Sequence, residues 1–111
     1  RVIGTHLHPD HIGLAGWLTK KHNVKLWMTR GELMTARMIV SDTSETMPDE
    51  AVAIQRAAGW DDAVLDSMKA RGWGRFSRVV HPLPRSYVRI KDGDVLEMGR
   101  HRWRVVVGSG H

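Results

Sequence analysis

Cysteine is absent from the 111 residues, and this absence excludes disulfide bonds, zinc ribbons and any thiolate metal ligand. No apolar run approaches the ~20 residues that a membrane span needs. Both absences fit a cytoplasmic protein, and we expect that location and no membrane association. The sequence has no initiator methionine and opens on Arg1 directly before an apolar pair. We therefore expect it to be an internal piece of a longer protein.

Negative charge is the scarcer sign, with 12 Asp and Glu against 17 Lys and Arg and a net charge of +5. Such a balance favours anionic partners. The basic residues are scattered in ones and twos, however, and do not form the dense stripe that is typical of nucleic-acid binding. We therefore expect a small, anionic substrate, with nucleic acid as the weaker alternative.

Side chains of the metal-ligand type are crowded near the start of the chain, at His6, His8, Asp10 and His11. Imidazole nitrogen and carboxylate oxygen suit zinc and its borderline-hard neighbours. Residues two apart in an extended segment point to the same side, so His6 and His8 can reach one ion together. Pro9 favours an extended backbone at His8, and the chain must then turn. We expect Asp10 and His11 to face away from the first pair, toward a second ion or a water. The alternative is a run of surface or capping residues that bind nothing.

The segment lies between a predicted strand and a predicted helix. Residues 2–3 have the pattern of a buried strand, and residues 11–22 that of a helix with Asp10 as its N-cap. Residues 24–28 predict a second strand, with Asn23 as the preceding helix stop. This order predicts a parallel βαβ unit with a right-handed crossover. Open α/β sheets usually place their sites at such strand ends.

Residues 30–84 are more helical and form a predicted insertion or cap. Its first helix begins at a capping box in which Thr29 caps and Glu32 can reach back. Two further helices are expected over residues 48–58 and 61–72, each followed or ended by glycine. Such an insertion either covers a substrate cleft as a lid or forms an outer helical layer, and the sequence favours neither interpretation.

Several isolated aromatic and imidazole side chains have simpler interpretations. Trp73 and Phe76 are expected to pack between helices and sheet rather than to stack on a substrate. His22 is interpreted as a cation at a helix C-terminus, His81 as an ordinary loop residue and His101 as an exposed turn residue.

The last third of the chain has strand patterns. Residues 87–90 and 95–98 flank a turn with Asp92-Gly93 at its tip, which predicts a β-hairpin. Residues 102–107 predict a further strand, half solvated where it begins. Its apolar end, Val105–Val107, is expected to enter the interior.

The pattern His6-x-His8-x-Asp10-His11 after a short apolar strand resembles the signature of the metallo-β-lactamase-fold hydrolases. The final stretch, residues 105–111, is similar to the strand and turn that carry the next histidine ligand of that superfamily, here His111. The resemblance implies an α/β fold, a four-layer αββα sandwich of which residues 1–111 form a partial domain with a helical insertion over residues 30–84. Among its branches we expect the one that is similar to glyoxalase II. Family members supply two more ligands, a bridging Asp and a final His, beyond the point that corresponds to residue 111.

The resemblance also implies the chemistry. His6, His8 and His111 would hold one zinc ion, and Asp10 and His11 a second, with iron or manganese as alternative metals. Two such ions share a hydroxide that forms near neutral pH, because metal binding lowers the pKa of water toward ~7. This metal-bound hydroxide attacks a small ester, thioester or lactone, and Asp10 orients it. The prediction is a binuclear zinc-dependent hydrolase, of which the 111-residue piece alone need not be active.

Three alternatives stay open beside this prediction. A nuclease or phosphodiesterase of the same fold would bind nucleic acid in a salt-sensitive manner. A non-catalytic domain would use the metal, or the remnant of a site, only to stabilise a binding scaffold. An amidohydrolase barrel also uses two histidines at a strand end, but it does not explain Asp10 and His11 or the helix directly after them.

Overall fold

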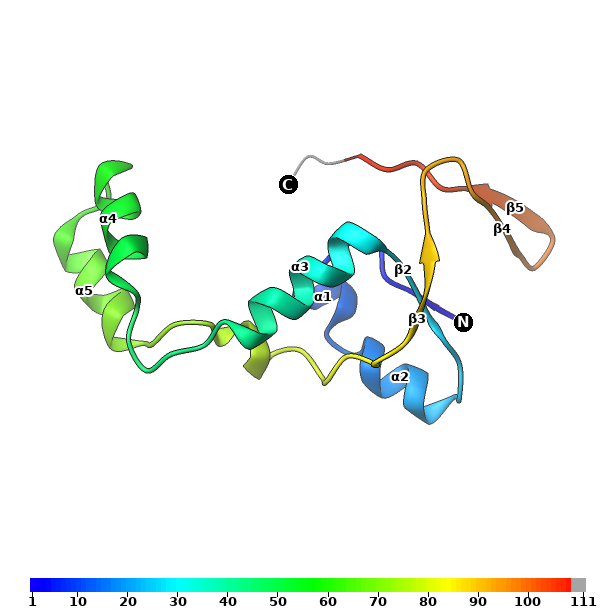
Figure 1. Ribbon diagram of the computed structural model, residues 1–111, viewed down its shortest axis with the longest axis horizontal. Helices are drawn as coiled ribbons and strands as arrows, with labels where there is room; N and C mark the ends of the chain where they lie inside the picture. The colour runs from blue at the N-terminus through cyan, green and yellow to red at the C-terminus, as the bar shows by residue number, and fades with distance from the viewer. Residues whose placement is uncertain (109–111) are drawn as a thin grey trace.

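The computed structural model describes residues 1–108, and a three-stranded parallel sheet organises them (Figure 1). The strand order in this sheet is β1 (Val2–Ile3), β2 (Leu26–Thr29), β3 (Tyr87–Ile90). Leu26 pairs with Val2 on one side and with Tyr87 on the other. Leu26 and Met28 of this central strand are fully buried, as expected of a strand flanked on both edges. The predicted parallel pairing of the first two strands is confirmed.

Two short helices, α1 (Pro9–Ile12) and α2 (Ala15–Lys21), connect β1 to β2. The predicted single helix over residues 11–22 with Asp10 as N-cap is wrong, because His8 occupies the N-cap position and Asp10 lies in the first turn of α1. The break between the helices has a tertiary cause. The carbonyl of Gly13 accepts a hydrogen bond of 2.7 Å from the His81 amide, which directs the backbone toward the loop before β3.

The same loop explains why a glycine stands in α2. A Cβ atom at Gly16 would lie 1.9 Å from the carbonyl oxygen of Pro82, well inside van der Waals contact. Only glycine allows α2 to approach the loop this closely. At the end of the helix, Asn23 has a positive φ of 48° and stops it, as predicted.

Helix α3 (Arg30–Ser41) follows β2 directly, whereas α4 (Asp49–Ala57) and α5 (Asp62–Ala70) form a separate pair. The two helices of the pair confirm the helices predicted over residues 48–58 and 61–72, and Asp61 caps α5 by accepting a hydrogen bond from the Ala63 amide (2.8 Å). The pair has a small core of its own, formed by Met47, Val52 and Leu65.

The molecule is elongated, with extents of 54 × 28 × 18 Å and a radius of gyration of 17.2 Å. A compact domain of this length has a radius of gyration of about 13 Å. The α4–α5 pair forms one end, and two connectors, residues 42–48 and 71–74, join it to the rest of the chain (Figure 1). The connectors meet at a bridge between Ser44 and Trp73, and Trp73 Nε1 donates a hydrogen bond of 3.0 Å to Asp42.

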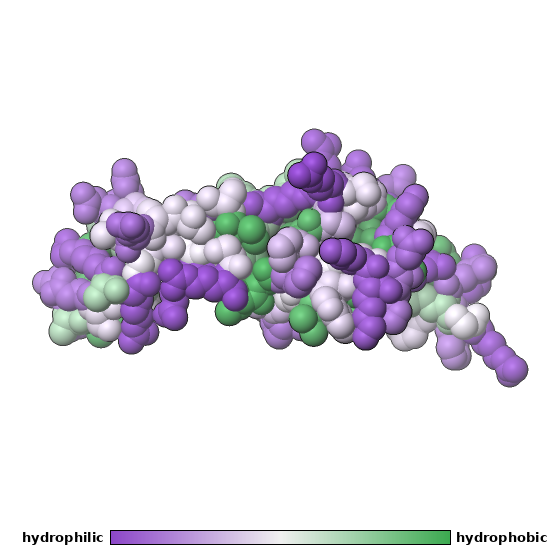
Figure 2. All heavy atoms as spheres, turned by 90° about the horizontal axis from the view of Figure 1, so that it is seen from below, coloured by the Kyte–Doolittle hydropathy of each residue, from purple (hydrophilic) through white to green (hydrophobic). Residues whose placement is uncertain are grey.

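The surface is mixed in character. Figure 2 shows hydrophilic side chains over much of one face, with hydrophobic patches between them. Within residues 1–108 there is no helix with both the length and the apolar character that crossing a membrane requires.

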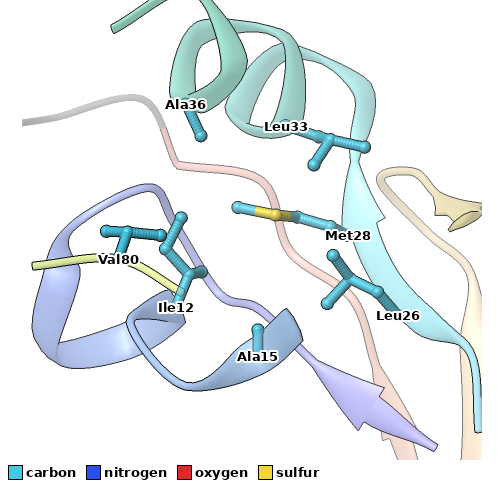
Figure 3. Close-up of a cluster of buried hydrophobic side chains, with 7 residues drawn as sticks. All are labelled: Ile12, Ala15, Leu26, Met28, Leu33, Ala36 and Val80. Atoms are coloured by element: carbon cyan, nitrogen blue, oxygen red, sulfur yellow. The ribbon is translucent and has the colours of Figure 1, made fainter. Parts of the chain in front are cut away.

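The main core lies between the sheet and helices α1, α2 and α3 (Figure 3). Seven buried residues form it: Ile12, Ala15, Leu26, Met28, Leu33, Ala36 and Val80. Phe76, in the short 3-10 helix η1 (Arg75–Arg78), packs against this core, and Trp73 packs against the core of the α4–α5 pair. These contacts confirm the predicted packing between helices and sheet for Phe76, whereas Trp73 packs against the helical pair and not against the sheet. Within the predicted insertion, α3 thus belongs to the sheet's core, and the lid interpretation of α4 and α5 stays a prediction.

The predicted hairpin between residues 87–90 and 95–98 is wrong. β3 pairs with β2, whereas β4 (Val95–Met98) forms an antiparallel pair with β5 (His101–Arg104). The Asp92-Gly93 turn binds the chain beyond β5 instead: the Gly93 amide donates to the Val105 carbonyl (2.9 Å), and Asp92 accepts from the Val107 amide (2.9 Å).

The end of the described chain also differs from expectation. Val106 and Val107 are 79% and 47% exposed, so the predicted entry of this stretch into the interior is wrong. The two-stranded β4–β5 sheet ends at Arg104 and covers neither side chain. His101 is exposed as predicted, but it begins β5 rather than lying in a turn.

Candidate functional site

The histidine segment, residues 4–11, begins at Gly4, where the chain leaves the sheet. The Gly4 amide donates to the Trp27 carbonyl (2.9 Å). A Cβ atom at Gly4 would lie 3.1 Å from both Ile12 Cγ2 and Met28 Sδ, so the backbone passes close against the core at this point. This close approach delivers Thr5 and His6 at the carboxyl end of the parallel sheet, where open α/β sheets place their sites.

The three imidazole rings of the segment gather around His6. The ring centroid of His6 lies 4.9 Å from that of His8 and 3.9 Å from that of His11. The expectation that His11 faces away from the first pair is therefore wrong. α1 begins directly at Pro9, and one helical turn, closed by the His11 amide on the His8 carbonyl (2.9 Å), brings His11 back toward His6.

The Thr5 hydroxyl orients two of these rings. Its Oγ1 lies 3.1 Å from Nδ1 of His6 and 2.9 Å from Nδ1 of His11. A hydroxyl oxygen has two lone pairs, so it can accept a hydrogen bond from both Nδ1–H groups at once. In that pair of tautomers, Nε2 is the nitrogen through which either ring would ligate a metal. The sequence pattern alone does not indicate this role, although Thr5 directly precedes it.

Asp10 lies at the open side of the group. Its Oδ2 is 3.5 Å from Nε2 of His11, and the two side chains are 80% and 42% exposed. A contact between side chains this exposed adds little to stability, so the carboxylate is held in place weakly. Asp10 and His11 also border a cleft of about 500 Å³ whose other walls are largely apolar, among them Val2, Ile3 and Leu14. Clefts of roughly 300–1,000 Å³ suit small molecules.

The donor types in this segment fit a metal, since imidazole and carboxylate are the ligands that zinc and its neighbours prefer. The structure brings them together as adjacent pairs, His6 with His8, His6 with His11 and His11 with Asp10. Within residues 1–108, three or more His, Asp or Glu side chains do not form one closed group around a single point. The remaining predicted ligand, His111, lies outside the described residues.

Glu32, which was predicted to reach back within a capping box, contacts the histidine segment instead. Thr29 caps α3 by accepting from the Glu32 amide (3.4 Å), which confirms half of the predicted capping box. The Glu32 carboxylate does not complete that box, because its Oε2 accepts a hydrogen bond of 2.8 Å from the Leu7 amide. Leu7 stands between His6 and His8, so Glu32 holds the histidine segment from the neighbouring strand end.

The other histidines lie apart from this arrangement. The His81 backbone binds Gly13, and its exposed side chain lies beside Gly16 of α2, as expected of a loop residue. His22 is the exposed C-cap of α2, in agreement with its interpretation as a helix C-terminal residue.

The chain is similar to a known protein family and to a solved structure. The family model described as the metallo-beta-lactamase superfamily matches residues 1–111. The chain is also similar to the crystal structure of a beta-lactamase domain protein from Burkholderia ambifaria, with 34% sequence identity and a TM-score of 0.75. The match covers 97% of this chain and 29% of that chain, so the present chain spans less than a third of that protein. Among curated proteins, no match was found.

Proposed function

Because the chain belongs to the metallo-β-lactamase superfamily, we propose that the protein is a metal-dependent hydrolase whose metal site includes the histidine segment. The superfamily and the α/β fold predicted from the sequence are confirmed. Members of this superfamily are generally hydrolytic and bind metal ions, usually zinc. The branch similar to glyoxalase II, the number of ions and the identity of the metal are parts of the proposal.

The observation that carries the proposal is the gathering of three imidazoles around His6 at the carboxyl end of a parallel sheet, with Thr5 at Nδ1 of two of them. A structural role alone does not account for Asp10 and His11, because both are exposed and the contact between them adds little to stability. The orientation of a metal-ligating histidine is usually fixed by a hydrogen bond to its second ring nitrogen, and Thr5 provides such a partner for His6 and His11.

In the proposed site, His6 and His8 would ligate one ion and Asp10 and His11 a second, with His111 as a further predicted ligand of the first. When bound, such ions supply Lewis acidity, which lowers the pKa of water toward ~7 and polarises a carbonyl. Thr5 keeps Nε2 of His6 and His11 directed to ligation. The exposed Asp10 carboxylate orients the attacking water and accepts its proton at Oδ1 or Oδ2. The apolar walls of the cleft beside Asp10 and His11 would hold the substrate's hydrocarbon part.

The proposed substrate is a small ester, thioester or lactone, and an anionic one in view of the net charge of +5. The alternative of the same fold is a nuclease or phosphodiesterase. In its favour, Arg102 and Arg104 stand exposed along β5. Hydrolysis measured between 50 mM and 200 mM salt separates the two. A nuclease that neutralises several phosphates loses orders of magnitude in affinity over this range, whereas a small ester hydrolase changes little.

The proposal is tested with the intact natural protein. We expect elemental analysis to find bound metal, chelation to abolish hydrolysis of a panel of esters and thioesters, and added zinc to restore it. His8→Ala and Asp10→Ala should each lower kcat/KM by at least about 100-fold. His101→Ala, which removes an exposed histidine of β5, is the matched control and should leave it unchanged.

Two results would overturn the proposal. Full activity after chelation, or in both variants, would remove the metal from the reaction. Stoichiometric metal without turnover of any ester, thioester or phosphodiester would favour the non-catalytic, metal-stabilised domain.

A further inference from the structure

The carboxylate of Glu32 is bound to the backbone of the histidine segment rather than to a cation. Its Oε2 accepts the Leu7 amide at 2.8 Å, across 25 residues of sequence, in a half-buried position. Within residues 1–108, none of the contacts between a carboxylate and a Lys, Arg or His nitrogen involves Glu32. A hydrogen bond to an ionised carboxylate is about twice as strong as one between neutral groups. The contact is therefore a strong, specific link between α3 and the segment.

The Leu7 amide has a particular need for this acceptor. Regular pairing of the first strand with β2 ends at the Gly4 amide, and residues 6–8 form a bend outside any helix or strand. The Leu7 side chain packs against the main core, which draws its backbone inward. A partly buried amide in an irregular segment must be satisfied by a side chain or by water, and Glu32 provides the side chain.

Two anchors thus fix the peptide between His6 and His8. The Leu7 side chain is held by the core and its amide by Glu32, so rotation of the His6–Leu7 peptide plane is restrained on both sides. Glu32 itself is restrained, because its own amide donates to Thr29 at the start of α3. The first turn of a helix also favours a carboxylate.

We propose that Glu32 is a positioning residue that sets the spacing of His6 and His8 for metal binding, by holding the Leu7 amide. This inference rests on the proposed metal site. A group that orients the backbone of ligands without ligating acts as an outer-shell partner, and loss of such a partner typically lowers metal affinity about 10- to 100-fold.

The test compares Glu32→Ala, Glu32→Gln and a matched control, Glu50→Ala, in the intact protein. Glu50 is an exposed glutamate in the first turn of α4, so its removal reproduces the loss of charge at a helix start. Two quantities are measured: the dissociation constant for zinc, by competition with a chromophoric chelator, and the exchange rate of the Leu7 amide hydrogen in the metal-free protein, by NMR.

We expect Glu32→Ala to weaken zinc binding about 10- to 100-fold and to speed exchange of the Leu7 amide. Glu32→Gln keeps a neutral acceptor of similar length, so it should recover about half of the loss on a logarithmic scale. Glu50→Ala should match the wild-type protein in both measurements. Circular dichroism of the two Glu32 variants checks that each is folded.

Wild-type zinc affinity in Glu32→Ala, or weaker binding with an unchanged Leu7 exchange rate, would overturn the positioning role while leaving the proposed function intact. If the wild-type protein binds no zinc, the proposed function fails together with the effect of Glu32 on metal affinity. Faster Leu7 exchange in Glu32→Ala would then still identify the contact as structural only.

Discussion

Replacement of Thr5 by valine tests how the histidine rings are held. Valine has the shape of threonine without the hydroxyl, so the substitution removes the contacts of 3.1 Å and 2.9 Å to Nδ1 of His6 and His11 and changes little else. Thr5 is exposed, and water can replace its hydroxyl in the metal-free protein. We therefore expect the free energy of unfolding without metal to change by less than about 0.5 kcal/mol.

Metal binding should respond much more strongly. Each lost hydrogen bond is worth about 1 kcal/mol, so loss of both should make the free energy of zinc binding about 2 kcal/mol less favourable. At 1.4 kcal/mol for each factor of ten, zinc affinity should fall roughly 30-fold. This value lies within the range of about 10- to 100-fold that loss of an outer-shell partner produces.

The assay is competition for zinc with a chromophoric chelator, together with urea unfolding in the presence and absence of zinc. Thr5→Ser retains the hydroxyl and should restore most of the affinity. Thr43→Val, an equivalent change at an exposed threonine of the 42–48 connector, should have no effect on zinc affinity. Wild-type zinc affinity in Thr5→Val, or equal losses in the valine and serine variants, would refute the orienting role of the hydroxyl.

Two further predictions concern the scaffold. Gly16→Ala should lower the free energy of unfolding in urea by about 3 kcal/mol or more, because the new Cβ would lie 1.9 Å from a backbone carbonyl oxygen. Gly31→Ala in α3, where nothing lies within 4 Å of such an atom, should raise it by about 0.5–1 kcal/mol, and equal urea midpoints for the two variants would contradict the close packing of α2. Leu33→Ala should cost about 2–5 kcal/mol, since this residue is fully buried in the main core. Leu14→Ala, at a residue that is 63% exposed, should cost less than about 0.5 kcal/mol in the same measurement, and a similar loss in both would show that the main core is misassigned.

Features with local causes were predictable from the sequence. Asp61 caps α5 through its own side chain, and Thr29 does the same for α3. A second strand was predicted over residues 24–28, in which Leu26 and Met28 are buried, and its parallel pairing with the first strand followed from the helix expected between them.

Features with tertiary causes were not predictable in the same way. The break before α2 depends on a hydrogen bond from His81, which no local pattern of residues 11–22 reveals. The Asp92-Gly93 turn has the sequence of a hairpin, but the turn binds residues 105 and 107, and β4 pairs with β5 instead of β3. Local propensity was thus overruled by long-range pairing.

The candidate site was likewise predictable in part. The residue types of the histidine segment were sufficient to indicate a metal site, because no common structural role needs them at that spacing. The approach of His11 to His6 depends on where α1 begins, and the contact between Glu32 and Leu7 joins two strand ends. Both are results of folding, so neither could be deduced from the order of the residues alone.

The separation between the main core and the small core of the α4–α5 pair has a thermodynamic consequence. The two cores share no buried residue, and the pair is attached through the connectors that meet at Ser44 and Trp73. A protein built in this way can open in parts, with each cooperative unit having its own free energy of opening. The helical pair, which buries only three residues in its core, should exchange its amide hydrogens well before the sheet does. The fold would then tolerate sequence change in the pair without disturbing the histidine segment.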